Sequence, residues 1–443
     1  MTRALALGVE RSLSGQAWRW RDAEDGGSSL QPDDLVTRIL LSRGAPRDRL
    51  DDFRRPSLRA FMPDPSMFAD MDRAAERLAD AVQRGEAIAV YGDYDVDGAT
   101  SAALLIRVLR QLGRNARPYI PDRLLEGYGP SAEALVRLKR EGADLVVTVD
   151  CGAQAFEALA AAHDAGLDVI VVDHHKCSTT LPIALALVNP NRLDESAEAA
   201  SHGHLAAVGV AFLLAAALVR TLRHRGYFAD RAEPDLMSLL DIVALGTVAD
   251  VAQLKGLNRA FVAQGLKVLG RRQNIGLAAL ADFARVNKMP GAHELGFAFG
   301  PRINAGGRVG EADLGVRLLT TEDPAEARDI AAELDRYNEE RRAIEAAVTE
   351  QALELCGATA NSPITVVSAP GWHPGVIGIV ASRLRERYRK PVVVIGIDRA
   401  ADAANHADHT GSSAGLAAAS ARIGQRHQCQ SWRAYVLSCR ACA

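Results

Sequence analysis

The sequence predicts an α/β fold in which a parallel-sheet domain is joined by a long helix to a smaller, incomplete α/β domain. From about residue 70, short apolar runs alternate with helical segments, which is typical of right-handed crossovers in a parallel sheet. We divide the chain into six segments: 1–69, an N-terminal extension; 70–255, the sheet domain; 256–323, a helical segment with an arginine motif; 324–356, the connecting helix; 357–398, the smaller domain; and 399–443, an atypical tail.

Two periodicities predict the elements of the larger domain. Continuous apolar runs predict strands that are buried on both faces, and apolar residues three and four apart predict amphipathic helices. In chain order we expect a helix over 71–84, a strand over 87–90, a helix over 99–112, a short strand ending near 120, a helix over 131–140, a strand over 144–149, a helix over 153–165, a strand over 168–172, a helix over 205–222 and an apolar segment over 236–254.

The smaller domain follows the charged helical pattern. Asp323 before Pro324 fits an N-cap followed by a first-turn proline, so the connecting helix should begin there. Residues 364–367 and 392–395 predict two strands, with the segment 371–388 between them. This arrangement predicts a second, smaller α/β unit.

The tail after residue 398 differs in composition from the rest of the chain. Its only acidic residues are Asp402 and Asp408, and its apolar periodicity fades. We therefore expect 399–443 not to fold as a native domain. A reading-frame change near residue 398 would explain the change in composition.

Composition and charge narrow the class of protein. With 48% hydrophobic and 24% charged residues, the chain can build a sizeable core, which excludes a disordered chain. No apolar run reaches the roughly 18 residues of a membrane span, and no secretory leader is recognisable, so we expect a cytoplasmic protein with no membrane contact. The net charge of −3 gives no support for nucleic-acid binding, although it leaves room for a local basic groove.

Acidic and histidine side chains follow three of the predicted strands. Carboxyl ends of parallel strands meet at one edge of a sheet, so these side chains should converge. Oxygen ligands with imidazole suit Mn²⁺ or Mg²⁺, and two such ions could share Asp150 and brace a phosphoryl group. The alternative is that each Asp only caps a helix. The set comprises Asp93, Asp95, Asp97, Asp150, Asp173, His174, His175 and Asp250.

The same stretches resemble the ordered motifs of the DHH phosphoesterase superfamily. These are Asp-Tyr-Asp-Val-Asp-Gly at 93–98, Val-Asp-Cys-Gly at 149–152, Asp-His-His at 173–175 and Gly-Thr-Val-Ala-Asp at 246–250. Within the superfamily the chain most resembles the RecJ family of bacterial single-strand-specific exonucleases. Residues 301–308 resemble that family's arginine motif, and 371–383 resemble the start of its DHH-associated domain. The resemblance covers roughly 70–398.

The resemblance implies a 5′-to-3′ exonuclease that degrades single-stranded DNA to mononucleotides with Mn²⁺ or Mg²⁺, in DNA repair and recombination. It also implies a single-strand-binding protein and a helicase as partners, and we expect a monomer. Asp173 would support a histidine, and His175 would act as a general acid or phosphate contact. The implied metal ligands are Asp93, Asp95, Asp97, Asp150, His174 and Asp250, and the implied catalytic residues are Asp97, Asp150 and His175.

A further set of residues is expected to bind phosphate or DNA. Arg123, in a loop after a predicted strand, could bind a terminal phosphate with two parallel hydrogen bonds, and Trp372 could stack on a base. The alternatives are a surface role for Arg123, a plain turn and helix around 302–308, and a core position for Trp372. The set comprises Arg123, Arg302, Asn304, Arg308, Trp372, His373 and Arg383.

The pattern departs from the family after residue 398. A Gly-Ser-Gly-Arg-Ser-like segment and an oligonucleotide-binding barrel usually follow, and neither is recognisable here. One alternative function is a phosphodiesterase for short oligonucleotides or cyclic dinucleotides, or a pyrophosphatase. Those relatives tend to carry a His four residues before the Asp-x-Asp pair, where this chain has Tyr91. The other alternative is an inactive truncated product or scaffold, which would have lost several of the metal-binding positions.

Overall fold

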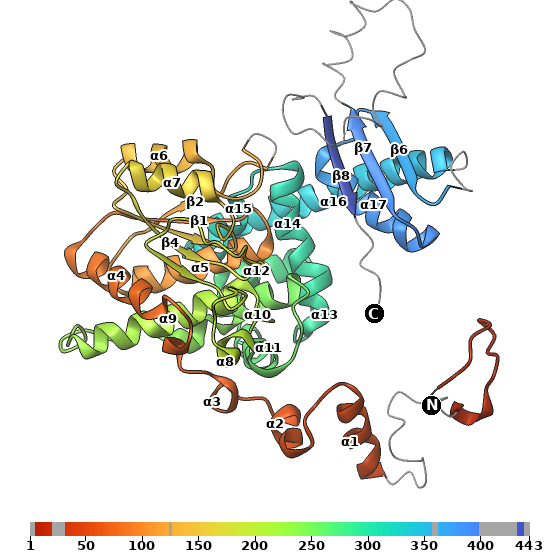
Figure 1. The fold of residues 1–443 in the computed structure, drawn as a ribbon, viewed down its shortest axis with the longest axis horizontal. Coiled ribbons are helices and arrows are strands. Elements are labelled where there is room, and N and C mark those ends of the chain that lie inside the picture. Colours follow the sequence, from red (N-terminus) through yellow and green to blue (C-terminus); the bar gives the residue numbers. More distant parts are fainter. Residues whose placement is uncertain (1–4, 20–31, 124–125, 357–361, 398–431, 438–443) are drawn as a thin grey trace, which may run out of the picture.

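The structure is a computed structural model that describes residues 5–19, 32–123, 126–356, 362–397 and 432–437. Figure 1 shows one large body around a sheet, a smaller body at the far end of a long helix, and an N-terminal arm of short helices. The arm contains α1 (Pro32–Ser42), α2 (Leu50–Arg54) and α3 (Leu58–Phe61).

The large body is built on a five-stranded sheet in the order β2-β1-β3-β4-β5, and every pairing is parallel. The central strands are continuous apolar runs because helices cover both faces of the sheet. The strands are β1 (Ile88–Gly92), β2 (Arg117–Tyr119), β3 (Leu145–Val149), β4 (Asp168–Val172) and β5 (Ala186–Val188).

Alternate residues of these strands enter two different cores, as the two-residue period of a strand requires. Val90 and Val147 pack with one set of helices, whereas Ala89 and Val146 pack with another. The first set contains α4 (Met71–Arg84), α5 (Val96–Gln111) and α9 (Ala207–His224), and the second contains α6 (Ala132–Arg140) and α7 (Phe156–Asp164).

Helix α9 is long and apolar enough to cross a membrane, by length and composition alone. Within the described residues it is the one helix of that kind, and 72% of its apolar window is buried against the rest of the domain. Its apolar character is therefore explained by packing in the core.

The first core continues through the helices that follow α9. Phe299, Ile303 and Leu314 belong to the same cluster as the residues of α5 and α9. The short helix α8 (Ala197–Ala200) precedes α9. The helices that follow α9 are α10 (Leu240–Ala249), α11 (Gly256–Leu269), α12 (Ile275–Phe283), α13 (Ala292–Glu294), α14 (Gly300–Val309) and α15 (Leu314–Thr320).

Helix α16 (Pro324–Cys356) joins the two bodies, and its 33 residues span about 50 Å. Asp323 Oδ1 accepts a hydrogen bond from Ala325 N at 2.8 Å, which is the N-cap that the sequence predicts. Leu334 lies in the core of the large body, whereas Val348 lies in that of the small one. The helix is therefore anchored at both ends by apolar packing.

The small body consists of β6 (Thr365–Pro370), α17 (Pro374–Tyr388) and β7 (Val392–Ile397), with the two strands parallel. A third strand, β8 (Trp432–Leu437), pairs antiparallel with β7. It falls in the tail, where the side-chain pattern predicted no element. Backbone pairing to an open edge does not need that pattern. The rest of the predicted tail lies outside the described residues. The predicted fold class is confirmed.

Candidate metal centre

Three neighbouring strands of the large sheet deliver an acidic residue to the same edge. Asp93, Asp150 and Asp173 each follow the last residue of β1, β3 and β4. Their backbone N–H groups continue the sheet by donating to Val149 O at 3.3 Å, Val172 O at 3.0 Å and Val188 O at 3.1 Å. The sheet therefore fixes these three residues side by side, as the sequence predicts.

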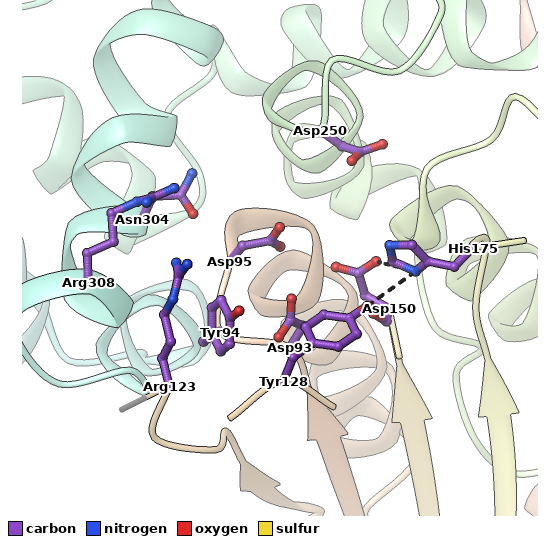
Figure 2. A pocket seen from close by; sticks show the side chains of 10 residues that line it. All are labelled: Asp93, Tyr94, Asp95, Arg123, Tyr128, Asp150, His175, Asp250, Asn304 and Arg308. Carbon is purple, nitrogen blue, oxygen red and sulfur yellow. Dashed lines mark hydrogen bonds and ion pairs between the residues drawn. The ribbon is translucent and has the colours of Figure 1, made fainter. Parts of the chain in front are cut away.

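The side chains at this edge form three groups whose ligand atoms lie within 4.8 Å of one another. Asp150 and His174 each belong to two groups, so the groups form one continuous centre. Figure 2 shows Asp93, Asp95, Asp150 and Asp250 facing the same space. The groups are Asp97 with His174 and Asp250; Asp93 with Asp95 and Asp150; and Asp150 with His174 and His175.

The chemistry of this centre fits divalent cations. Asp93 Oδ1 and Asp150 Oδ1 are buried and accept no hydrogen bond within the described part of the chain. Burial, followed by neighbouring carboxylates, raises the pKa of Asp93 to about 7 and the pKa of Asp150 well above its usual range. Burial likewise raises the pKa of Asp97 to about 7. A cation among these oxygens would remove the repulsion that keeps them protonated.

His174 is oriented to use its outer nitrogen. Nδ1 lies 2.9 Å from Leu205 O, and because a carbonyl can only accept, Nδ1 carries the hydrogen. Nε2 then faces the centre, 3.2 Å from Asp150 Oδ1 and 3.8 Å from Asp97 Oδ2. This backbone contact is the kind of outer support that fixes a metal-binding histidine.

Helix capping, the alternative role for the acidic residues, occurs at the same positions. Asp95 caps α5 by accepting from Asp97 N and Gly98 N. Asp97 accepts from Ala207 N at 2.7 Å and Val208 N at 2.9 Å, at the start of α9. Each carboxylate has about four lone-pair positions, so capping leaves room for a cation. Gly98 is required here, because a Cβ would lie 2.4 Å from Asp93 O.

Asp173 differs from the other buried carboxylates of the edge. Its Oδ1 accepts from His174 N at 2.7 Å and from His175 N and Nδ1 at 3.1 and 2.8 Å, and its Oδ2 accepts from Ala153 N at 2.9 Å. Although burial opposes it, these bonds lower the pKa of Asp173, and the same contact raises the pKa of His175. Asp173 belongs to none of the three groups found among the described residues and instead holds the His175 ring.

A cavity of about 450 Å³ opens beside the acidic residues. Arg123, Asn304 and Arg308 line its opposite side (Figure 2). The Arg123 guanidinium lies 4.9 Å from the centre of the Tyr94 ring, and Arg308 Nη1 donates to Gly375 O at 3.0 Å. Burial lowers the pKa of Arg308, followed by the charges of neighbouring arginines. The cavity therefore lies between a carboxylate side, whose chemistry suits cations, and an arginine side, whose chemistry suits anions and which we call the anion-binding side.

Comparison with known proteins places the chain in a family. The model of the DHH family N-terminal domain matches residues 87–247. The crystal structure of exonuclease RecJ bound to manganese is 39% identical to this chain, with 74% of this chain and 80% of that chain covered and a TM-score of 0.66. The chain belongs to the RecJ family.

Two further RecJ proteins show how much of the family's length is present. The single-stranded-DNA-specific exonuclease RecJ of Dickeya dadantii is 41% identical over 369 residues, which are 81% of this chain and 63% of that protein. The Mn²⁺ complex of RecJ from Thermus thermophilus is 36% identical over 83% of this chain and 50% of that chain, with a TM-score of 0.67. This RecJ-family chain therefore spans about half to two thirds of the length of these relatives.

Four of the residues expected at the DNA do not line this cavity in the RecJ-family chain: Arg302, Trp372, His373 and Arg383. Arg302 donates to Asp335 Oδ1 and Ala298 O, both at 2.8 Å. Residues 300–309 form helix α14, and residues six apart on a helix point about 120° from each other, so Arg302 and Arg308 diverge. Trp372 is 4% exposed in the core of the small body, which matches the core alternative. Arg383 pairs with Glu345.

His373 is the residue of the small body that does approach the anion-binding side. Its Nδ1 accepts from Gly375 N at 3.0 Å, which caps α17. It also lines a smaller cavity of about 100 Å³ together with Arg123 and Arg308. Its predicted contact with DNA stays a prediction.

Two kinds of residue in this centre, one tyrosine and two asparagines, were not predicted from the sequence. The Tyr128 hydroxyl donates to Asp150 O at 3.3 Å, and its oxygen lies 3.5 Å from His175 Nδ1. Asn189 Nδ2 donates to His175 O at 2.8 Å, and Asn191 Nδ2 donates to His174 O at 2.6 Å. The available signs were the glycines on both sides of Tyr128 and the Asn-Pro-Asn triplet directly after β5.

Proposed function

We propose that this chain is a metal-dependent 5′-to-3′ exonuclease that hydrolyses single-stranded DNA to mononucleotides. The observation that carries the proposal is a buried carboxylate, Asp150, that is shared by two groups of potential ligands beside a cavity lined by Arg123 and Arg308. RecJ relatives named as single-stranded-DNA-specific exonucleases, about 40% identical to this chain, support it. The chain spans 63% of the length of such a relative, so we propose the activity of the full-length relative for this chain.

Two Mn²⁺ or Mg²⁺ ions fit the donor set. Asp97, His174 and Asp250 would hold one, Asp93 and Asp95 would hold the other, and Asp150 would serve both. When bound, such ions would acidify water and offset the negative charge of the phosphoryl oxygens.

The remaining roles belong to side chains of this protein. Arg123 and Arg308 lie where they could bind phosphate oxygens, and a guanidinium can do so with two parallel hydrogen bonds. Asp173 holds Nδ1 of His175 at 2.8 Å and favours the protonated ring. His175 Nε2 would then give a proton to O3′ of the mononucleotide as its bond to phosphorus breaks, while the shortened strand keeps the phosphate.

The test is release of mononucleotides from a long 5′-phosphorylated single strand by the 443-residue chain. We expect release with Mn²⁺, none with chelator, and none from Asp150→Ala. A two-nucleotide substrate provides the comparison for the alternative phosphodiesterase. Faster turnover of the dinucleotide would favour that alternative, and identical background rates for the parent and Asp150→Ala would favour the inactive product.

The proposed function also covers the oligomeric state, the compartment and the partners of the enzyme. We propose that it acts as a monomer in the cytoplasm, in DNA repair and recombination, beside a single-strand-binding protein and a helicase. The burial of its one long apolar helix within the described part of the chain supports a site of action away from membranes. Light scattering of the purified chain tests the monomer.

A further inference from the structure

A second cavity, of about 390 Å³, lies at the opposite end of α10 from Asp250. Asp241 lies in the first turn of α10 and lines this cavity, whereas Asp250 caps the other end of the helix. At a rise of roughly 1.5 Å per residue, the two are about 13 Å apart along the helix axis. No lining residue is shared with the cavity at the metal centre, so the two sites are separate.

Two buried polar groups line this second cavity. Asp241 is 2% exposed, and its Oδ1 accepts from Ile242 N at 2.8 Å. Asn274 is 5% exposed and caps α12 through Oδ1, which accepts from Leu277 N at 3.0 Å. Asn274 Nδ2 is buried and donates to nothing within the residues that the structure describes. A buried donor without an acceptor is unfavourable, so this amide is available for a ligand.

The walls of the second cavity combine apolar and polar side chains, and Arg272, Asp282 and Lys288 add charged groups. Leu277, Ala281 and Val286 line it, and Met289, which is 63% exposed, adds a flexible thioether. The volume falls within the range of about 300–1,000 Å³ that is usual for small-molecule sites. A flat, largely apolar ring with polar edge atoms suits such a cavity.

We propose that this cavity binds a nucleobase, carried by a nucleoside or mononucleotide. An ionised carboxylate can only accept hydrogen bonds, and the Asn Nδ2 group can only donate them. Asp241 and Asn274 therefore call for a ring edge with an N–H donor beside an acceptor, and the edges of the bases carry both. The inference concerns a site apart from the metal centre and does not rest on the proposed nuclease activity.

Calorimetry with nucleosides tests the proposal on the full chain in chelator, which keeps the metal centre out of the measurement. Guanosine and adenosine are the probes, and ribose is the control without a base. Asn274→Asp keeps the capping oxygen but removes the donor, and Asp241→Asn keeps the oxygen that serves Ile242 but weakens the acceptor. We expect nucleosides to bind the parent, each variant to weaken binding at least about tenfold, and Asn115→Asp, at an exposed residue outside this cavity, to leave it unchanged.

A second measurement covers the case in which a variant does not fold. The Met289 methyl resonance of the parent should shift on addition of guanosine and stay in place on addition of ribose. Absence of both heat and a methyl shift at millimolar nucleoside overturns the proposal. Equal nucleoside affinity in the parent and both folded variants also overturns it.

Discussion

At the carboxyl edge of the large sheet, a buried aspartate directly follows each of three adjacent strands, whereas Gly371 follows β6 of the small sheet. The small body contributes backbone to the anion-binding side, where Gly375 O accepts from Arg308. The parallel strands of the large body thus bring carboxylates together, whereas the small body supplies a backbone acceptor for Arg308 of the large body. Ligand chemistry depends on which residues end the strands, and the sheet alone does not supply it.

The largest effect should come from the shared carboxylate. Asp150→Asn removes an oxygen donor from two ligand groups at once, so Mn²⁺-dependent nucleotide release should fall by more than about 100-fold. Release from labelled single strands measures this. The matched control is Asp164→Asn, an exposed carboxylate, which should keep the parent rate. Equal rates for the two variants would show that Asp150 holds no ion.

The next effect concerns the carboxylate that holds a histidine. Asp173→Asn should lower activity by about 10- to 100-fold, the range for loss of an outer partner. Because the Asp173 carboxylate raises the pKa of His175, the amide should lower that pKa. The high-pH limb of the rate profile should then move to lower pH. NMR titration of His175 measures the shift, and an unchanged pKa would contradict this role.

Arg302 and Arg308 lie on different sides of α14, so their variants should have different effects. Arg308→Lys should weaken binding of a 5′-phosphorylated strand about tenfold, because one charge-assisted hydrogen bond contributes about 1.5 kcal/mol. Arg302→Lys should leave that affinity unchanged and lower the melting temperature, because Arg302 pairs with Asp335. Fluorescence anisotropy and thermal melting measure the two quantities. Equal loss of affinity in both variants would place Arg302 at the DNA after all.

Metal removal should change how stability depends on pH. The pKa values of Asp93 and Asp97 are raised to about 7 in the metal-free fold. Between roughly pH 4 and 7 the folded chain therefore holds protons that the unfolded chain releases, so these two groups lower stability as pH rises. Cations need the deprotonated groups, so the gain in melting temperature from Mn²⁺ should be larger at about pH 7.5 than at about pH 5.5. A gain that is independent of pH would contradict this assignment.

The smallest effect should be that of Trp372→Phe. The side chain is buried, and its Nε1 donates to Gln351 Oε1 at 2.8 Å, so loss of this bond should cost about 1 kcal/mol of unfolding free energy. Affinity for single-stranded DNA should stay at the parent value. Urea unfolding and anisotropy test both statements. A drop in affinity with unchanged stability would restore the stacking role.

Four of the five strands of the large sheet, the connecting helix and the acidic edge could be predicted from the sequence, whereas the short strand β5 was missed. Asp93, Asp150 and Asp173 could be placed together because apolar runs mark buried parallel strands and such strands end at one edge. The helix over 324–356 was predictable from its periodicity and its cap, which are local properties. His174 directly follows Asp173, and the resemblance to known motifs implied His174 and Asp250 as metal ligands.

Roles that depend on side-chain direction and on distant neighbours became apparent from the packing of the folded chain. The helical form of 300–309 turned Arg302 towards Asp335 and left Arg308 at the cavity. Packing against the connecting helix placed Trp372 in a core, and Tyr128 reached His175 across 47 positions of the chain. Periodicity reports the next few residues along the chain, whereas these contacts depend on how separate elements pack, which no local pattern encodes.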